Sequence, residues 1–369
     1  MRIGVPKEVK TMEFRVGLTP ACVSVLVQDG QEVWVQSGLG EAIGYSDEAY
    51  ASSGAKIVSS PKEIYSCDMV VKVKEPIPEE YPLLREGLVL FCYLHLAPNP
   101  ELTKALVDSK VIAIAYETVT DRFGHLPLLV PMSEIAGRIS IQEGAHALQM
   151  VSGGKGVLLG GVPGVLPGKV TIVGGGVVGT EAARMAMGLG ADVTILDTNL
   201  RRLKELDILF MHRLKTLYSN PVSIAEAIAD ADLVVGSVLI PGKRAPKVIS
   251  REMIAAMGPG SVFVDVAIDQ GGCSDTSRPT THTSPTYVVD GVVHYCVTNM
   301  PGACSRTSSQ ALTNATLSYV RALARGGYVT ALQKDRGLQD GLNVCNGKVT
   351  NEPVAADLGY SYYPPEQVL

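Results

Sequence analysis

The stretch Lys169-Val170-Thr171-Ile172-Val173-Gly174-Gly175-Gly176-Val177-Val178-Gly179 decides the fold of this chain. A β-branched, apolar run leads into a Gly-x-Gly-x-x-Gly motif, and a helical pattern begins directly after the motif. The glycines permit a tight turn and let the main chain approach a pyrophosphate at the free N–H groups of the helix. The stretch therefore predicts a strand, a turn and a helix that bind a dinucleotide.

An acidic residue at the end of the next predicted strand supports this interpretation. Asp197 follows the apolar run 193–196, at the distance along the chain where a carboxylate binds the adenine ribose hydroxyls. Its charge would repel a 2′-phosphate, whereas Arg201 and Arg202 could hold one. The balance favours NAD over NADP as cofactor.

Short apolar runs alternate with helical patterns on both sides of the motif. Before it, strands are expected at Arg2–Pro6, Glu32–Gln36, Lys56–Val58, Met69–Lys74, Val89–Leu94 and Val111–Tyr116. From the motif onward, they are expected at Lys169–Val173, Asp192–Leu196, Asp232–Leu239, Ser261–Ile268 and Val292–Val297. This alternation predicts an α/β fold with two doubly wound, largely parallel sheets.

Two helices are expected outside these series. One begins with Ser133 as its N-cap, continues to about Met150 and connects the two sheet-forming regions. The other covers Ser308–Ala324 and is followed by irregular structure without a new series of strands. The tail is too short for an independent domain, so we expect it to pack onto an earlier one.

Composition narrows the class of protein. The 369 residues are 46% hydrophobic and 19% charged, which is enough for a large core. A net charge of -5 without a basic block argues against nucleic-acid binding. The seven cysteines form no Cys-x-x-Cys pair, so neither a metal centre nor a disulfide framework is expected. The charged N-terminus and the absence of an uninterrupted apolar segment predict a cytoplasmic protein outside the membrane.

Polar residues follow four of the predicted strands. They are Lys74, His95, Asp269 and Asn299. Ligands of parallel sheets bind outside the carboxyl ends of the strands, so these residues are candidates for a substrate site. Arg15, in the loop after the first strand, could add a bidentate clamp for a carboxylate. Each has an ordinary structural alternative, such as a solvated charge or a turn former. With hydride transfer left to the cofactor, the set suits a small 2-amino or 2-hydroxy acid.

Six separated segments carry a more specific pattern. In chain order they read MRIGVPKE from Met1, KVKEP from Lys72, YLHLA from Tyr93, PMSEIAGR from Pro131, DVAIDQGG from Asp265 and NMPG from Asn299. In this combination the chain resembles the alanine dehydrogenase family over its whole length. The resemblance implies a reversible, NAD-dependent oxidative deamination of L-alanine to pyruvate and ammonia, and a homohexamer. It also implies a substrate domain of residues 1–127 and 306–369 around an inserted NAD domain of residues 128–305.

The resemblance also implies roles for single residues. Arg15 and Lys74 would bind the substrate, with Asn299 beside them, while His95 and Asp269 would carry the proton transfers. Together with the glycine motif and Asp197, the expected NAD contacts are Ser133, Gly174, Gly176, Val177, Val178, Gly179, Arg202, Ser219, Val238, Leu239, Ala267, Ile268, Asp269, Gln270, Arg278, Val297, Thr298, Asn299 and Met300.

Three alternative functions stay open at this point. The chain could act on another small 2-amino or 2-oxo acid, because alanine specificity rests on the resemblance alone. The soluble part of proton-pumping transhydrogenase has a related fold, but this chain carries no membrane segment and does carry His95 and Asp269. A catalytically silent NAD-binding regulator is the third.

Overall fold

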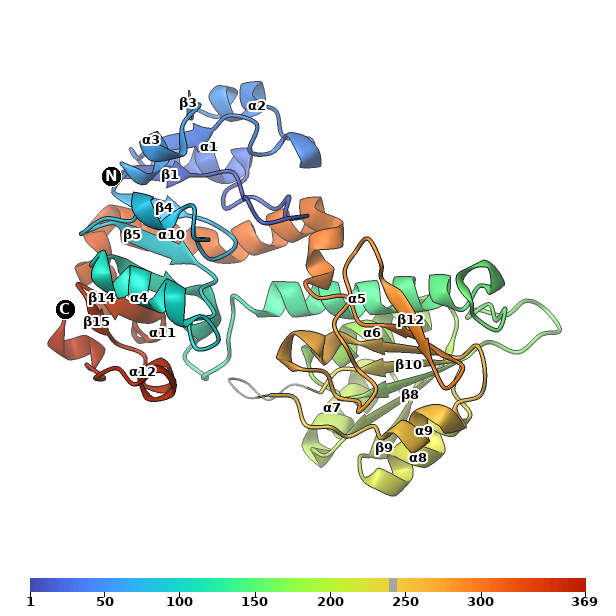
Figure 1. Cartoon of the computed structure of the whole chain (residues 1–369). Helices are drawn as coiled ribbons and strands as arrows, with labels where there is room; N and C mark the ends of the chain where they lie inside the picture. Colours follow the sequence, from blue (N-terminus) through green and yellow to red (C-terminus); the bar gives the residue numbers. More distant parts are fainter. Residues whose placement is uncertain (239–243) are drawn as a thin grey trace. The chain divides into compact units, whose positions relative to one another are not determined.

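The computed structural model describes residues 1–238 and 244–369 and contains two compact units (Figure 1). Unit 1 comprises Met1–Met132 and Cys304–Leu369, and unit 2 comprises Ser133–Ala303. The boundaries expected from the sequence lie after residue 127 and before residue 306. Each unit is built around one mainly parallel sheet.

The sheet of unit 1 has the strand order β15-β14-β6-β5-β4-β1-β2-β3. Its strands are β1 (Arg2–Val5), β2 (Glu32–Gln36), β3 (Lys56–Val58), β4 (Met69–Val71), β5 (Val89–Cys92), β6 (Ile112–Ala115), β14 (Leu342–Cys345) and β15 (Lys348–Val349). The first six pair in parallel, and their order reverses between β1 and β4. This is the predicted doubly wound arrangement, and such a reversal point is where open sheets bind ligands.

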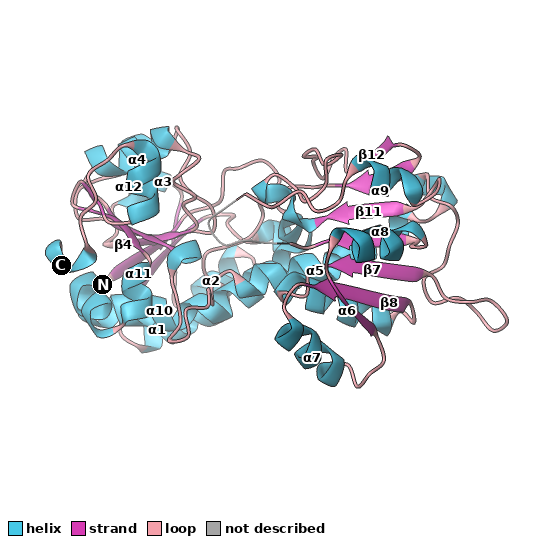
Figure 2. Ribbon diagram, turned by 90° about the horizontal axis from the view of Figure 1, so that it is seen from below, coloured by secondary structure: helices cyan, strands magenta, loops and turns pink. Residues whose placement is uncertain are grey.

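Helices cover both faces of this sheet (Figure 2). On one face lie α3 (Pro61–Tyr65), α4 (Pro100–Asp108) and α12 (Glu352–Leu358), which share a core of aliphatic residues with the strands. On the other face lie α1 (Pro20–Gln28) and α10 (Ser305–Lys334); α2 (Asp47–Ser52) packs beside α1 and β3. Several of these helices begin at a proline. Proline suits the first turn of a helix, because an N–H group there would have no acceptor within the helix.

The C-terminal segment differs from the expectation. α10 extends beyond Ala324 and changes direction at Gly327, whose φ of 70° lies outside the helical range. After α11 (Arg336–Asp340), the chain adds β14 antiparallel to β6, and then β15. The prediction of irregular structure is wrong, because a strand of four residues contains too few positions for its alternation to stand out from a loop. The tail does pack onto the earlier domain, as expected, and it does so by extending the sheet.

The sheet of unit 2 has the order β12-β13-β11-β10-β7-β8-β9. Its strands are β7 (Lys169–Val173), β8 (Asp192–Asp197), β9 (Lys215–Tyr218), β10 (Leu233–Gly236), β11 (Val262–Asp265), β12 (Thr286–Val289) and β13 (Val292–Tyr295). All pair in parallel except β12. Besides most of α5 (Val130–Ala147), the α-helices of this unit are α6 (Val177–Gly188), α7 (Leu200–Leu209), α8 (Pro221–Ala229) and α9 (Arg251–Ala256). The second doubly wound sheet is thereby confirmed.

The helix that links the sheet-forming regions, α5, covers Val130–Ala147. Ser133 therefore lies inside its first turns, and the prediction that Ser133 is its N-cap is wrong. Pro131 explains the difference, because its fixed φ is already helical and its missing N–H costs nothing at the start of a helix. The helix can thus begin before the serine.

Candidate functional site

The glycine turn between β7 and α6 has the geometry that a dinucleotide requires. Gly174 has a φ of +107°, and a Cβ there would lie 2.7 Å from the carbonyl oxygen of Ser237. At Gly179, a Cβ would lie 1.9 Å from the carbonyl oxygen of Gly174, so only glycine lets the helix pack this closely on the turn. At Gly176, a Cβ would meet no described atom within 4 Å. The motif therefore has one glycine for the turn, one for packing and one beside open space.

Gly176 is also the N-cap of α6 and is exposed. The N–H groups of the first helical turn have no partner within the helix, and together with the helix dipole they favour an anion. Asp197, at the end of β8, lies next to this turn: its Oδ2 accepts the N–H of Gly175 at 2.7 Å and its Oδ1 accepts that of Asn199 at 2.8 Å. The turn, the helix and the carboxylate fit a dinucleotide with an unphosphorylated ribose.

Arg202 holds the glycine turn from the outside. Its Nε donates to the carbonyl oxygen of Gly175 at 2.7 Å and its Nη2 to Oγ1 of Thr180 at 2.6 Å. Nη1 lies 3.2 Å from Oε2 of Glu205, which balances the charge. A guanidinium engaged in this way is a poor receptor for a 2′-phosphate, so the arrangement supports the preference for NAD.

The other residues expected to contact NAD are distributed over unit 2. Ser133 lies in α5, and Val177 and Val178 open α6. Most of the others follow the carboxyl ends of strands: Ser219 after β9, Val238 after β10, Ala267, Ile268, Asp269 and Gln270 after β11, and Val297, Thr298, Asn299 and Met300 after β13. Arg278 is exposed, with its guanidinium 4.2 Å from the ring centre of Tyr287. Leu239 lies outside the described residues.

Asp269 lies on a 3₁₀ turn, η5 (Val266–Gln270), and not at the end of an extended strand. The strand stops at Asp265, because the buried carboxylate of Asp265 accepts the N–H groups of Ala267 at 3.0 Å and Cys273 at 2.8 Å and so caps the turn. Asp269 is exposed, and its Oδ1 accepts the N–H of Asn299 at 3.3 Å. The structure thus brings Asp269 and Asn299 together within unit 2.

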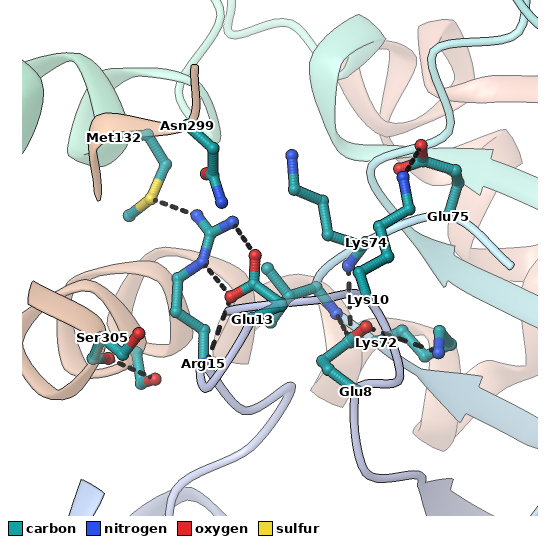
Figure 3. Close-up of polar contacts among 12 residues, drawn as sticks. Glu8, Lys10, Glu13, Arg15, Lys72, Lys74, Glu75, Met132, Asn299 and Ser305 are labelled. Carbon is teal, nitrogen blue, oxygen red and sulfur yellow. Dashed lines mark hydrogen bonds and ion pairs between the residues drawn. The ribbon is translucent and has the colours of Figure 1, made fainter. Parts of the chain in front are cut away.

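Three candidates lie in unit 1, after adjacent parallel strands. Arg15 is in the loop between β1 and α1, Lys74 follows β4, and His95 follows β5. The reversal of strand order lies between β1 and β4. These three residues therefore lie at the carboxyl ends of the strands around the reversal, where a ligand is expected. Figure 3 shows Arg15, Lys74 and the acidic residues around them.

The guanidinium of Arg15 is buried against Glu13 and Met132. Its Nε donates to Oε1 of Glu13 at 2.7 Å, its Nη2 to Oε2 at 2.6 Å, and its Nη1 points to Sδ of Met132 at 3.2 Å. Burial alone would raise the pKa of Glu13, but the hydrogen bonds and charge of Arg15, helped by Lys74, hold it below its ordinary value. Glu13 therefore stays ionised and fixes the plane of the guanidinium. Glu13 is not among the residues expected from the sequence, although its position two residues before Arg15 was a usable signal.

His95 is held in a left-handed conformation, with a φ of +48°. Its N–H donates to Oε1 of Glu117 at 2.6 Å, and the N–H of Leu94 reaches the same oxygen at 3.1 Å. Nδ1 of His95 lies 3.9 Å from that oxygen, and the ring of Tyr93 stacks on the imidazole with centres 5.9 Å apart. Such backbone strain persists where the surroundings enforce it, and it is concentrated at functional sites. Glu117 also escaped sequence analysis; its place after β6, the next strand of the sheet, was the signal.

Two family models match successive parts of the chain. A family model described as "Alanine dehydrogenase/PNT, N-terminal domain" matches residues 4–136, and one described as "Alanine dehydrogenase/PNT, C-terminal domain" matches residues 140–352. The alanine dehydrogenase of Bacillus subtilis is 58% identical over 370 residues, which cover 100% of this chain and 98% of that protein. The chain belongs to the alanine dehydrogenase family.

Other relatives support the same assignment. The alanine dehydrogenase of Methanococcus maripaludis is 55% identical over 371 residues, with full coverage of both chains. A solved structure titled L-alanine dehydrogenase superposes with a TM-score of 0.95 at 53% identity, over 97% of this chain and 99% of that one. A transhydrogenase from Sinorhizobium meliloti has a TM-score of 0.82 at 23% identity, covering 95% of this chain and 99% of that one, and shares the fold.

The described residues include neither a membrane-spanning helix nor a cluster of metal-binding side chains. No helix there is long and apolar enough to cross a membrane. The same residues contain no group of three or more histidine, cysteine, aspartate or glutamate side chains placed to hold a metal ion.

Proposed function

We propose that this chain is an NAD-dependent L-alanine dehydrogenase. It converts L-alanine, NAD⁺ and water reversibly into pyruvate, ammonium, NADH and a proton. The observation that carries the proposal is the 58% identity to the alanine dehydrogenase of Bacillus subtilis across the whole length of the chain. The glycine turn with Asp197 supports the cofactor independently, because its geometry suits NAD whatever the substrate is.

We propose the following roles in substrate binding. Arg15 and Lys74 bind the carboxylate of alanine or pyruvate, and Asn299 contributes a polar contact. Glu13 keeps the guanidinium of Arg15 in one orientation through two hydrogen bonds. A guanidinium that is oriented beforehand loses less side-chain entropy when it binds a carboxylate.

His95 and Asp269 are proposed to carry the protons of the reaction. NAD, when bound, would supply the acceptor for the hydride that leaves Cα of alanine. Hydrolysis of the resulting imine needs a base for the attacking water and an acid for the departing ammonia, and an imidazole and a carboxylate can exchange these tasks. Either group can be the principal base.

Initial rates with different substrates test the proposal. Purified protein, NAD and L-alanine at alkaline pH should form NADH, followed by its absorbance, several times faster than with L-serine, glycine or lactate. If another small amino acid gives equal or greater activity, that amino acid and not alanine would be assigned as the substrate. Tight NAD binding without turnover of any amino or hydroxy acid would instead indicate a non-catalytic regulator.

We also propose that the protein is a cytoplasmic homo-oligomer, a hexamer by resemblance to its family. The segment between α5 and β7 supports self-association. Several of its large apolar side chains are exposed, including Val151 at 90% and Leu166 at 87%. Val162 and Val165 bridge the two sides of this segment. Light scattering should give the molar mass of an oligomer for the unmodified chain and a lower molar mass for Leu166→Asp. A monomer in both samples would contradict this proposal.

A further inference from the structure

A cluster of buried charges lies beneath Lys74 and has no role in the proposed chemistry. We call it the Lys72 cluster; it consists of Glu8, Tyr65, Lys72 and Glu80. The side chain of Lys72 is fully buried, and those of Glu8 and Glu80 are 2% and 8% exposed. Nζ of Lys72 lies 2.7 Å from Oε1 of Glu80 and 3.5 Å from Oε2 of Glu8. The hydroxyl of Tyr65 donates to Oε1 of Glu80 at 2.8 Å.

The two carboxylates of the cluster hold the main chain on both sides of Lys74. Oε1 of Glu8 accepts the N–H of Val73 at 2.7 Å and that of Lys74 at 3.4 Å. Oε2 of Glu80 accepts the N–H of Ile77 at 3.0 Å. Figure 3 shows the side chain of Lys72 turned toward Glu8, while that of Lys74 points in another direction. The segment 73–77 is thus tied at its two ends to carboxylates that share one lysine.

Burying three charged groups is expensive, and the arrangement shows what offsets the cost. Burial raises the pKa of Glu8, and the charge of Lys72 and the N–H of Val73 oppose that rise. Burial would lower the pKa of Lys72, but Glu8 and Glu80 together raise it above its ordinary value. A buried ion pair is weak evidence for stability, because well-packed apolar residues often serve as well. Its retention beneath a candidate substrate residue calls for a functional reason.

We propose that Glu8 is a positioning residue, which fixes the main chain at Val73 and Lys74 and thereby sets where the ammonium of Lys74 meets the substrate carboxylate. This inference rests on the proposed function, since it takes Lys74 as a substrate ligand. The same segment also contacts the chain just before His95, because the N–H of Tyr93 donates to the carbonyl oxygen of Val73 at 3.1 Å. A displacement of Val73 would therefore reach the chain that leads to His95.

Three single variants test the proposal. Glu8→Ala removes the acceptor for both N–H groups. Glu8→Gln keeps a carbonyl acceptor for them and leaves Lys72 paired with Glu80, so it is the conservative rescue. Tyr65→Phe removes one hydrogen bond from the same cluster without touching residues 73 and 74, and it is the matched control for a general loss of stability.

We expect Glu8→Ala to raise the KM for pyruvate about tenfold or more, since a misplaced ligand loses about one charge-assisted hydrogen bond. Its kcat should fall less, and the KM for NADH should stay within about twofold, because the cofactor contacts lie in unit 2. Glu8→Gln and Tyr65→Phe should keep the KM for pyruvate within roughly threefold of the unmodified chain.

Hydrogen–deuterium exchange supplies a readout that needs no catalysis. In Glu8→Ala, the amides of Val73 and Lys74 should exchange faster than in Tyr65→Phe. Unchanged exchange, or an unchanged KM for pyruvate despite faster exchange, would overturn the positioning role, as would a Glu8→Gln variant as impaired as Glu8→Ala. If Glu8→Ala does not fold, the comparison of Glu8→Gln with Tyr65→Phe decides. A raised KM for pyruvate in Glu8→Gln overturns the role. Slow exchange of the amides of Val73 and Lys74 in Glu8→Gln, together with a normal KM for pyruvate, supports it. An unmodified chain that forms no NADH from L-alanine would instead overturn the proposed function.

Discussion

Replacing Gly176 by alanine separates cofactor binding from folding. The residue has a φ of -68° and a ψ of -160°, which alanine adopts without strain, and the new Cβ would meet no described atom within 4 Å. Alanine is a poorer N-cap than glycine, but it also lowers the entropy of the unfolded chain, so the free energy of unfolding should change by less than about 0.5 kcal/mol.

NAD binding should respond differently, because the Cβ occupies the open space beside the N-terminus of α6. If the pyrophosphate approaches there, Gly176→Ala loses about one charge-assisted hydrogen bond, worth roughly 1.5–3 kcal/mol. The Kd for NADH should then rise roughly 10- to 100-fold. Titration of NADH fluorescence and denaturant unfolding of the same preparation measure the two quantities.

Gly179→Ala is the matched comparison within the same motif. Its Cβ would lie 1.9 Å from a main-chain oxygen, so the turn must move, at a cost of about 3 kcal/mol in the free energy of unfolding. A Gly176→Ala variant that folds normally and binds NADH with an unchanged Kd would refute the placement of the pyrophosphate at this helix. Equal stability of the two variants would refute the distinction between the two glycines.

Three further predictions concern other parts of the chain. His95→Ala should lower kcat roughly 100-fold or more with unchanged thermal unfolding; near-normal turnover would remove His95 from the mechanism. Asp197→Ser should lower the ratio of kcat/KM for NAD over NADP at least about tenfold, because it removes the repulsion of a 2′-phosphate, and an unchanged ratio would contradict the ribose contact. Hydrogen bonds from Arg321 and Arg325 lower the pKa of Asp29 from 3.8 to about 2, so its stabilisation is present above pH 3.8 and is lost as the pH falls through 2. The free energies of unfolding of Asp29→Asn and the unmodified chain, measured against pH, should therefore converge over that interval, and a constant difference would be inconsistent with the ion pairs.

Contacts were predictable where a known motif fixes the spacing of the interacting residues. The glycine turn and Asp197 belong to such a motif, so their contact across 22 residues was predictable. Glu8 contacts an amide 65 residues away outside any motif, and it was not predictable. Glu117 also contacts an amide 22 residues away, but only its place after the strand β6 could have indicated it.

The strands of the C-terminal tail illustrate the same limit at longer range. Leu342–Cys345 acquires its role only by pairing with β6, whose residues precede the whole of unit 2 in sequence. By itself the segment contains four residues, Leu-Asn-Val-Cys, which are too few for an alternation of polar and apolar side chains to be distinctive. Tertiary pairing, and not local propensity, makes it a strand.

The pairing of β6 with β14 has a consequence for how the chain folds during its synthesis. During synthesis, unit 2 leaves the ribosome as one contiguous segment and can close its own sheet at once, since domains fold as units in the order in which they emerge. Unit 1 must wait, with the edge of β6 uncovered until residues 342–345 have been translated. An uncovered, apolar strand edge is a template for pairing with other chains. Slow translation anywhere between β6 and β14 should therefore promote aggregation, whereas slow translation after residue 345 should not, and the nascent chain gains most from a chaperone in that interval.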